Sequence, residues 1–375
     1  MVRKTSNHSV LIVGNYCHDV LIQNGIVLAE TLGGAASFIS NVLNGLSISC
    51  NLIAKVGHDF KYETNYPPIV VSSSKTTVFH AYFDSISDPS GHQDRLLKRV
   101  CACDPIRPSD LPDAKFDYGM AVGVGGEILP ETLEKMLEIC NVVFVDIQSI
   151  IRVFNGVDGT VNLVSLKDSG FYHLLPKIGY LKASSDEALF MDVEELRKLC
   201  CVVVTYGKEG CEVYWRDGKV KISPFLAHQI DPTGAGDSFL GGFVTGLFQG
   251  LAVPDAALLG NFFGSMTVAQ IGLPKFDSRV LQRVKDEVQT RKMSCGGRRG
   301  DELRFMKLAG HDQFHASLSA AKLVSACAIQ ECQQDLPNCP AMTGERGFVA
   351  QYNGQPKLLL NSVYEKSIQT VEGKP

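Results

Sequence analysis

Short runs of consecutive apolar residues alternate with longer amphipathic stretches over roughly the first 290 residues of the chain. The apolar runs are rich in Val and Ile, which is typical of strands buried on both faces of a parallel sheet. The amphipathic stretches repeat their apolar residues every three to four positions, as helices do. This alternation predicts an α/β fold with one doubly wound, mostly parallel central sheet flanked by helices. The expected strands include 10–13, 51–57, 118–124, 142–146 and 201–205, and the expected helices include 130–140, 239–251 and 256–271.

Two regions depart from this alternation. Residues 69–103 contain short β-branched or alternating segments separated by Ser-rich and Asp-Pro-Ser-Gly turns, so we expect a small β lid beside the main sheet. Past residue 292 the periodicity weakens, and 337–375 is rich in Pro, Gly, Asn and Gln. We therefore expect one domain at 1–293 and a poorly ordered tail at 294–375, in which only 318–329 has the pattern of a short helix.

Composition limits the partners and the compartment. The 375 residues carry a net charge of −4, which argues against nucleic acid or an anionic membrane surface as the main partner. The 12 cysteines are scattered without paired C-x-x-C blocks, so they favour reduced thiols over a zinc site. The apolar runs are too short for a membrane span or a signal peptide. We expect a cytoplasmic protein whose partner is a small molecule.

The segment Asp-Pro-Thr-Gly-Ala-Gly-Asp-Ser-Phe at 231–239 concentrates the candidate chemistry. Gly234, Ala235 and Gly236 bring small residues to an expected helix N-terminus, where bare N–H groups and the helix dipole favour an anion such as phosphate. Asp237 follows in the first turn. A carboxylate beside a phosphate site can take the proton of a hydroxyl that attacks phosphorus. An Asp at this position can equally cap a helix without any chemistry.

Two further features lie where open α/β sheets bind their ligands, near the carboxyl end of the first strand. Asp19 follows the expected strand 10–13, and Gly33 and Gly34 open a small-residue turn before a helix. Glycines allow a ligand to contact the main chain closely. Taken alone, these residues are explained equally well as a loop carboxylate and a tight turn.

Several common signatures are missing from the sequence. There is no G-x-x-x-x-G-K-[ST], which argues against a P-loop kinase. No G-x-G-x-x-G follows the first strand, which disfavours a Rossmann dehydrogenase. The hydrolase motifs G-x-S-x-G and H-E-x-x-H are absent as well.

Residues 231–242 resemble the C-terminal signature of the ribokinase-like (PfkB) carbohydrate kinases. Gly33 and Gly34 with the following helix, and then Lys-Val-Gly-His-Asp at 55–59, are similar to the N-terminal signature of the same family. The similarity runs from about residue 10 to about 290 in the family's order, and 119–130, 145–148 and 182–187 are most similar to plant members that act on myo-inositol. The resemblance implies a ribokinase-like fold and an ATP- and Mg²⁺-dependent kinase of a small polyol, with myo-inositol as the expected acceptor.

The resemblance also implies a role for each matching position. Asp237 corresponds to the general base, and the N–H groups of Gly234, Ala235 and Gly236 correspond to the anion hole for the transferred phosphate. Glu187 corresponds to the acid of the family's N-x-x-E motif, which helps to hold Mg²⁺ through water. The positions that match nucleotide-binding residues are Thr205, Gly207, Gly210, Ser184, Glu187 and Asn261, and those that match the acceptor site are Asp19, Gly33, Gly34 and Phe38.

Two positions depart from the family pattern. Ser184 stands where the family usually has Asn, which puts the details of metal ordering in doubt. Phe38 replaces an Asn that is commonly found four residues after the second glycine and normally binds a sugar hydroxyl. An apolar wall is more compatible with the C–H faces of a cyclitol than with ribose or a ketohexose.

Other interpretations remain open at this point. The chain could be a kinase of another sugar or nucleoside, of the ribokinase, fructokinase or adenosine kinase type. It could also be a catalytically inactive kinase-like scaffold, although Asp237 and the glycines are intact. The sequence does not give the phosphorylated hydroxyl, the need for a monovalent cation, or the choice between monomer and homodimer.

Overall fold

The computed structural model describes residues 9–83, 95–294 and 302–334. The expected tail at 337–375, most of the expected linker at 294–300 and the middle of the expected lid at 84–94 lie outside these residues.

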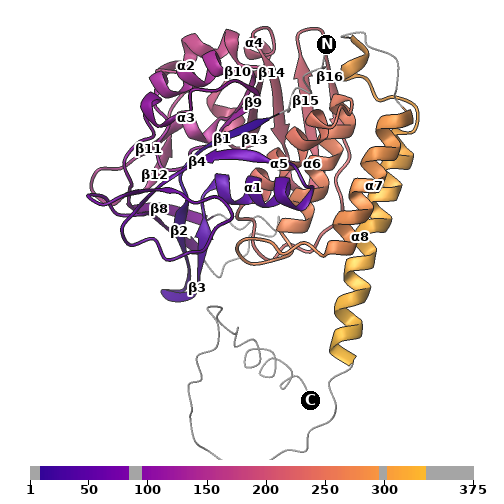
Figure 1. The fold of residues 1–375 in the computed structure, drawn as a ribbon, viewed down its shortest axis with the longest axis horizontal. Coiled ribbons are helices and arrows are strands. Elements are labelled where there is room, and N and C mark those ends of the chain that lie inside the picture. The colour runs from indigo at the N-terminus through magenta and orange to yellow at the C-terminus, as the bar shows by residue number, and fades with distance from the viewer. Residues whose placement is uncertain (1–8, 84–94, 295–301, 335–375) are drawn as a thin grey trace, which may run out of the picture. The chain divides into compact units, whose positions relative to one another are not determined.

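A mostly parallel sheet of eight strands forms the centre of the fold (Figure 1). Its first six strands in space are parallel to one another, β15 is antiparallel to β14, and β16 is antiparallel to β15. In spatial order the strands are β4 (Cys50–Ile53), β1 (Val10–Val13), β9 (Phe116–Ala121), β10 (Cys140–Asp146), β13 (Tyr180–Ser184), β14 (Cys201–Thr205), β15 (Cys211–Trp215) and β16 (Gly218–Ile222). The expected α/β fold class is confirmed.

Each face of the sheet packs against its own layer of helices. Successive residues of a strand point to opposite faces, so Val10 and Ile12 belong to one apolar cluster and Leu11 and Val13 to the other. The first cluster includes residues of α1 (Ala35–Gly45), α5 (Ala235–Phe248), α6 (Val253–Thr267) and α7 (Ser278–Ser294). The second includes residues of α2 (Pro130–Ile139), α3 (Gln148–Ile151) and α4 (Val193–Leu196). The valine-rich strands therefore form because both of their faces are buried.

The glycines of α5 and α6 allow these two helices to approach closely. A Cβ on Gly242 would lie 2.8 Å from the Leu259 carbonyl oxygen, and one on Gly246 would lie 2.7 Å from the Ala256 Cα. Glycine lowers the helix propensity of α5 at these positions, and the close packing against α6 explains its presence at both.

A second sheet of four strands forms the lid, with β2 (Cys17–Gln23) and β3 (Ile26–Gly33) beside β7 (Thr77–Phe83) and β8 (Arg95–Cys101). We expected the lid at 69–103 only, so the hairpin β2–β3 was missed. Its turn is Asn24-Gly25, with both φ angles positive at 51° and 79°, which is a strong hairpin signal. β6 (Ile69–Val71) pairs with β5 (Lys55–Gly57) in a separate two-stranded sheet and is not part of the lid.

The expected boundary at residue 293 is too early. α8 (His311–Gln334) buries Phe314, Leu318 and Ala321 against the domain, and the described residues up to Cys332 belong to one unit. The buried carboxylate of Asp255 on α6 accepts from Arg291 Nε of α7 at 2.8 Å and from His311 Nδ1 at 2.6 Å. This contact joins α6, α7 and the start of α8.

The remaining elements are short. A hairpin consists of β11 (Arg152–Phe154) and β12 (Val161–Leu163). Single 3₁₀ turns lie at Pro108–Asp110, Leu166–Asp168, Tyr172–Lys177, Glu187–Phe190, Gly207–Glu209 and Glu302–Phe305.

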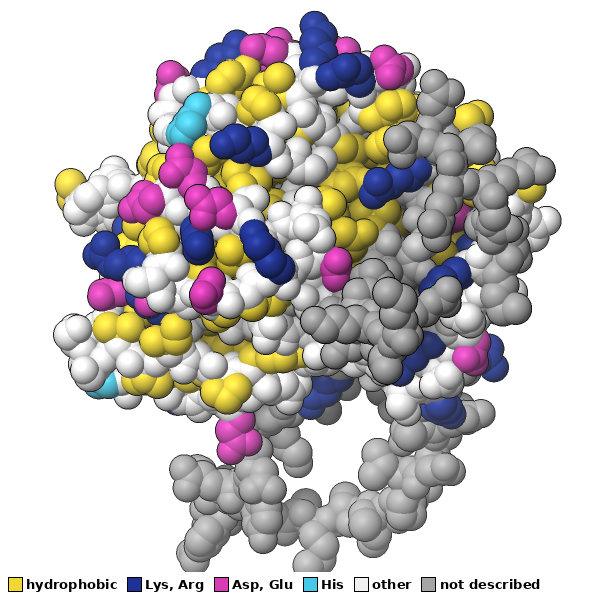
Figure 2. All heavy atoms as spheres, turned by 45° about the horizontal axis from the view of Figure 1, so that its top comes forward, with side chains coloured by type: hydrophobic (Ala, Val, Ile, Leu, Met, Phe, Trp, Pro, Cys, Tyr) yellow, Lys and Arg dark blue, Asp and Glu magenta, His cyan; other side chains and the backbone are white. Residues whose placement is uncertain are grey.

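Basic and acidic side chains are interspersed over the face shown in Figure 2, without a large patch of one sign. Among the described residues, no helix combines the length and the apolar character needed to cross a bilayer.

The α5–α6 contact predicts that Gly246→Ala destabilises the fold, although alanine is the better helix former. The added methyl meets the Ala256 Cα and Cβ at 2.7 and 2.8 Å, and overpacking of this kind costs about 1–3 kcal/mol. Urea unfolding measures the effect. Gly156→Ala is the matched control, because no atom lies within 4 Å of a Cβ there. Equal stability of the two variants would contradict the packing explanation.

Candidate active site

The first turn of α5 is shaped by a left-handed glycine. Gly234 precedes the helix with φ 75°, and a Cβ on it would lie 2.1 Å from the Phe38 ring. Both the backbone conformation and the close ring therefore require glycine here. The Ala235 N–H reaches the Pro232 carbonyl oxygen at 3.3 Å. The N–H groups of Gly234 and Gly236 have no acceptor among the described residues, as expected for a helix start that can bind an anion.

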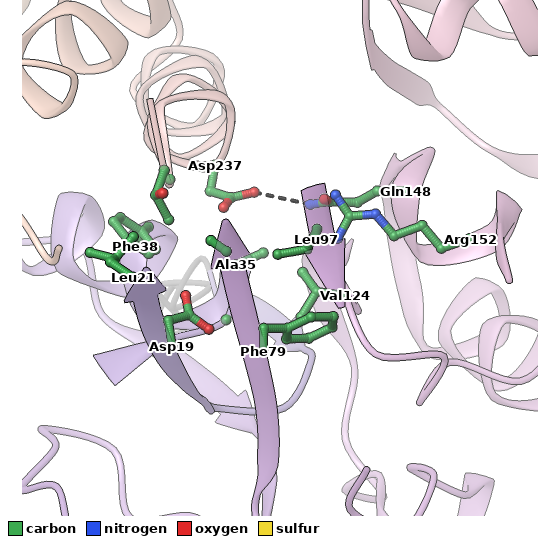
Figure 3. Close-up of a pocket in the computed structure, with 14 residues that line it drawn as sticks. Asp19, Leu21, Ala35, Phe38, Phe79, Leu97, Val124, Gln148, Arg152 and Asp237 are labelled. Atoms are coloured by element: carbon green, nitrogen blue, oxygen red, sulfur yellow. Dashed lines mark hydrogen bonds between the residues drawn. The ribbon is translucent and has the colours of Figure 1, made fainter. Parts of the chain in front are cut away.

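Asp237 lies in the same turn and borders a pocket of about 520 Å³. Gln148 Nε2 donates to Asp237 Oδ1 at 3.1 Å (Figure 3). Asp237 as a whole is partly exposed, so it is not a fully buried structural residue.

The β lid and α1 supply the other walls of this pocket. Asp19 of β2 borders it from the lid side and Asp237 from the α5 side (Figure 3). Gly34 and Phe38 also line the pocket, whereas Gly33 does not. Gly33 instead lies directly against the Asp19 carboxylate, because a Cβ on it would come 2.0 Å from Asp19 Oδ2. Most of the remaining wall is apolar and consists of Leu21, Ala35, Phe79, Ala81, Leu97 and Val124.

A second and larger pocket of about 1130 Å³ lies on the other side of the α5 turn. Four residues that the sequence assigned to nucleotide binding line it, namely Thr205, Gly207, Gly210 and Asn261. Ala235 and Gly236 line this pocket, whereas Gly234 and Asp237 line the first. Four consecutive residues of one helix start therefore form the wall that the two pockets share.

A buried ion pair supports this wall and was not expected from the sequence. Asp146, the last residue of β10, is paired in register with Lys182 in the middle of β13, and Lys182 Nζ lies 3.0 Å from Asp146 Oδ2. A Cβ on Gly236 would lie 2.8 Å from Lys182 Nζ. The ammonium group therefore lies directly against the second glycine of the α5 turn.

Three carboxylates surround the ammonium group of Lys182. Burial alone would lower the pKa of Lys182, but the carboxylates of Asp146, Glu187 and Asp237 raise it above its ordinary value. Burial raises the pKa of Asp146 to about 7, because the attraction of Lys182 only partly offsets desolvation and the repulsion from Glu187 and Asp237. One ammonium thus compensates a group of three acids.

Ser184 and Glu187 line neither pocket but lie beside this charged group. Glu187 Oε2 accepts from the Ser184 N–H at 2.8 Å and from its hydroxyl at 3.0 Å. Burial opposes ionisation of Glu187, yet Lys182, Arg152 and these hydrogen bonds hold its pKa below the ordinary value. Ser184 therefore orients an ionised carboxylate.

Two other side chains at this site were also missed. Gln148 and Arg152 follow the end of β10, on α3 and at the start of β11, and both line the smaller pocket (Figure 3). The sequence could have indicated both residues, because they come soon after Asp146 at the end of an expected strand. Side chains that follow the carboxyl end of a parallel strand lie at the ligand-binding edge of the sheet.

The charge imbalance predicts that Lys182→Met costs more stability than Asp146→Asn. Removing the ammonium takes away the buried cation that Asp146 and Glu187 share, which costs about 3–5 kcal/mol, whereas Asp146→Asn leaves Lys182 beside Glu187 and Asp237. The double variant should recover part of the loss. Denaturant unfolding of the three variants tests this order, and a larger loss for Asp146→Asn would contradict it.

Comparison with known proteins places this geometry among sugar and polyol kinases. Residues 146–276 match the family model described as pfkB family carbohydrate kinase. The chain is 64% identical to the "Inositol 3-kinase" of Arabidopsis thaliana over 89% of this chain and 92% of that protein. It is 49% identical to the protein of the same name from Oryza sativa subsp. japonica, over 92% of this chain and 87% of the other.

Solved structures share the fold at low sequence identity. A pyrophosphate-dependent kinase in the ribokinase family, complexed with a pyrophosphate analog and myo-inositol, matches with a TM-score of 0.60 and 16% identity over 71% of this chain and 97% of that chain. The nucleoside kinase of Methanocaldococcus jannaschii matches with a TM-score of 0.54 and 19% identity, over 76% and 98%.

Proposed function

The chain belongs to the pfkB family of carbohydrate kinases, and from this we propose that it transfers the γ-phosphoryl group of ATP to a hydroxyl of myo-inositol. The products are an inositol monophosphate and ADP. The observation that carries the proposal is the α5 turn at Gly234–Asp237, which is the common wall of a small and a large pocket. The names of the relatives from Arabidopsis and rice support myo-inositol as the acceptor.

In this proposal the α5 turn holds the group that is transferred. The N–H groups of Gly234, Ala235 and Gly236 face the γ-phosphate, with the Ala235 N–H exchanging its long contact to Pro232 for the ligand. The acceptor oxygen attacks phosphorus, the bond from phosphorus to the β-phosphate oxygen breaks, and the hydroxyl proton passes to Asp237. Gln148 Nε2 donates to Asp237 Oδ1 at 3.1 Å and thereby orients the carboxylate that accepts the proton.

Lys182 and Arg152 add positive charge on either side of this turn. Lys182 touches Gly236 from behind and Arg152 lines the acceptor pocket. Fixed charges of this kind stabilise a phosphoryl group in transfer because they need no reorganisation during the reaction. We therefore add both residues to the site that was inferred from the sequence.

The family implies ATP and usually Mg²⁺, and the residues present fit that metal. Mg²⁺ keeps most of its waters and uses one or two carboxylates together with substrate phosphates. Glu187 is such a carboxylate, ionised and oriented by Ser184, and the described residues contain no cluster of three or more metal-binding side chains. When bound, Mg²⁺ would neutralise charge on the β- and γ-phosphates.

The acceptor pocket suits a ring that carries both hydroxyls and C–H faces. Asp19 can accept hydrogen bonds from neighbouring hydroxyls, and Phe38, Leu21 and Leu97 offer apolar contact. A sugar-binding Asn at position 38 would instead require a hydroxyl there. A cyclitol such as myo-inositol matches this combination of groups.

The proposed compartment is the cytoplasm, and the proposed state is a monomer or homodimer. The eight cysteines between Cys17 and Cys211 are free thiols, which supports a reducing environment.

An acceptor panel tests the proposed function. With ATP and Mg²⁺, kcat/KM for myo-inositol should exceed that for ribose, fructose and adenosine by at least about tenfold, because only the cyclitol fits both the Asp19 and the Phe38 side of the pocket. NMR of the product identifies the phosphorylated hydroxyl. Preference for one of the other acceptors would overturn the substrate assignment, and absence of turnover with bound ATP would favour an inactive scaffold.

Asp237→Asn should lower kcat by about 10²–10⁴-fold, the usual contribution of a general base. The affinity for ATP should change little, because the nucleotide pocket is lined by other residues. Asp19→Asn is the matched control, since it makes the same chemical change in the same pocket and should mainly raise the KM for myo-inositol. An Asp237→Asn variant with near-normal kcat would remove the base assignment.

A further inference from the structure

The C-terminal helix α8 lies against the wall of the larger pocket and not merely against the outside of the domain. Its start is fixed by the buried contact of His311 with Asp255 and by Arg291, which donates to the Ala309 carbonyl oxygen at 2.6 Å. Helix α8 is drawn in yellow beside α7 in Figure 1. From this fixed start, two further side chains of α8 reach residues that line the pocket.

The pocket wall that they reach has little backbone support of its own. Residues 223–229 form neither helix nor strand, and Pro224, Phe225 and Leu226 line the pocket. The described main-chain hydrogen bonds resume only at Ile230. The position of this wall therefore depends on side chains that bind its carbonyl groups.

His315 and Lys322 of α8 supply these side-chain contacts. His315 Nε2 donates to the Pro224 carbonyl oxygen at 3.1 Å, and its ring lies 4.6 Å from the Phe225 ring. Lys322 Nζ donates to the Leu226 carbonyl oxygen at 2.7 Å and to the Ser265 hydroxyl at 2.8 Å. Because Ser265 lies on α6 and also lines the pocket, Lys322 connects two walls of the pocket from behind.

The surroundings of Lys322 disfavour its charged form. Its partners among the described residues are neutral oxygens, including the Ser265 carbonyl at 3.4 Å, and burial lowers its pKa to about 8. The three N–H bonds of an ammonium match these three acceptors. Leu226, whose carbonyl is held in this way, keeps its side chain 95% exposed at the pocket, as expected for an apolar group that contacts a ligand.

We propose that Lys322 and His315 are positioning residues for the nucleoside part of the donor, so that α8 sets the affinity for ATP. The inference rests on the proposed function in taking ATP as the donor. The phosphates are assigned to the α5 turn at Ala235–Gly236, which leaves the aromatic and apolar wall around Phe225 and Leu226 to the base and ribose. Among the described residues, the side-chain hydrogen bonds of His315 and Lys322 reach this wall and Ser265 of α6, and none of them reaches the reacting groups.

Replacing Lys322 tests whether α8 affects binding of the nucleoside part of ATP and leaves binding of its phosphates unchanged. In the full chain, Lys322→Met should raise the KM and Kd for ATP about tenfold, while kcat at saturating ATP and the KM for myo-inositol stay within about twofold. Binding of inorganic tripolyphosphate, which has no nucleoside, should change by less than about twofold. Lys322→Arg should restore part of the ATP affinity, because it keeps a long cationic donor.

Lys307→Met is the matched control, since Lys307 is exposed and precedes α8, and it should change none of these constants. If Lys322→Met does not fold, His315→Leu provides the same comparison. Unchanged ATP binding, or equal weakening of ATP and tripolyphosphate, would overturn the inference. A wild-type protein that binds ATP but does not phosphorylate myo-inositol would refute the proposed acceptor and leave this binding test valid.

Discussion

The first turn of α5 has to present its main chain to two pockets at once, and this requirement explains the unusual residues around it. Any side chain at 234 would collide with Phe38, and any at 236 would collide with the ammonium of Lys182. The turn is therefore held between an aromatic ring on one side and a buried cation on the other. Because Lys182 is itself paired with Asp146 across β10 and β13, the position of the turn is tied to the centre of the sheet.

The same constraint explains why glycine recurs further along α5. A helix that carries an anion site on its first turn has to be fixed firmly, and α5 is fixed by close contact with α6 at Gly242 and Gly246. The loss of helix propensity at each glycine is about 1 kcal/mol or less. Tight packing with few voids resists displacement, so the reacting groups are held by the most rigid part of the molecule.

The sequence predicted those features whose signal is local. Gly234–Asp237 follow one another in a helix start, and the strands of the sheet are continuous apolar runs. The Asp146–Lys182 pair joins two strands 36 residues apart, and no periodicity indicates which strands become neighbours. The β2–β3 hairpin carried an Asn-Gly turn, but the outer residues of β3 are exposed and lack the alternation of a half-buried strand. Helix α8 was expected only from 318, because polar contacts such as His311 with Asp255 dock its first turns.

The α5 turn, the lid strands and the donor wall differ in the contacts that hold them in place. These differences match the role that we propose for each. The α5 turn, to which we assign the transferred group, is fixed by buried side chains and helix packing. The proposed acceptor pocket is lined in part by strands of a separate four-stranded sheet, so a changed side chain on the lid can alter this pocket without disturbing the α5 turn. The proposed donor wall at 223–226 is held by side chains of α6 and α8. On this proposal, binding constants for ATP can change through residues distant from the phosphates, whereas the chemical step depends on a turn that is closely packed on both sides.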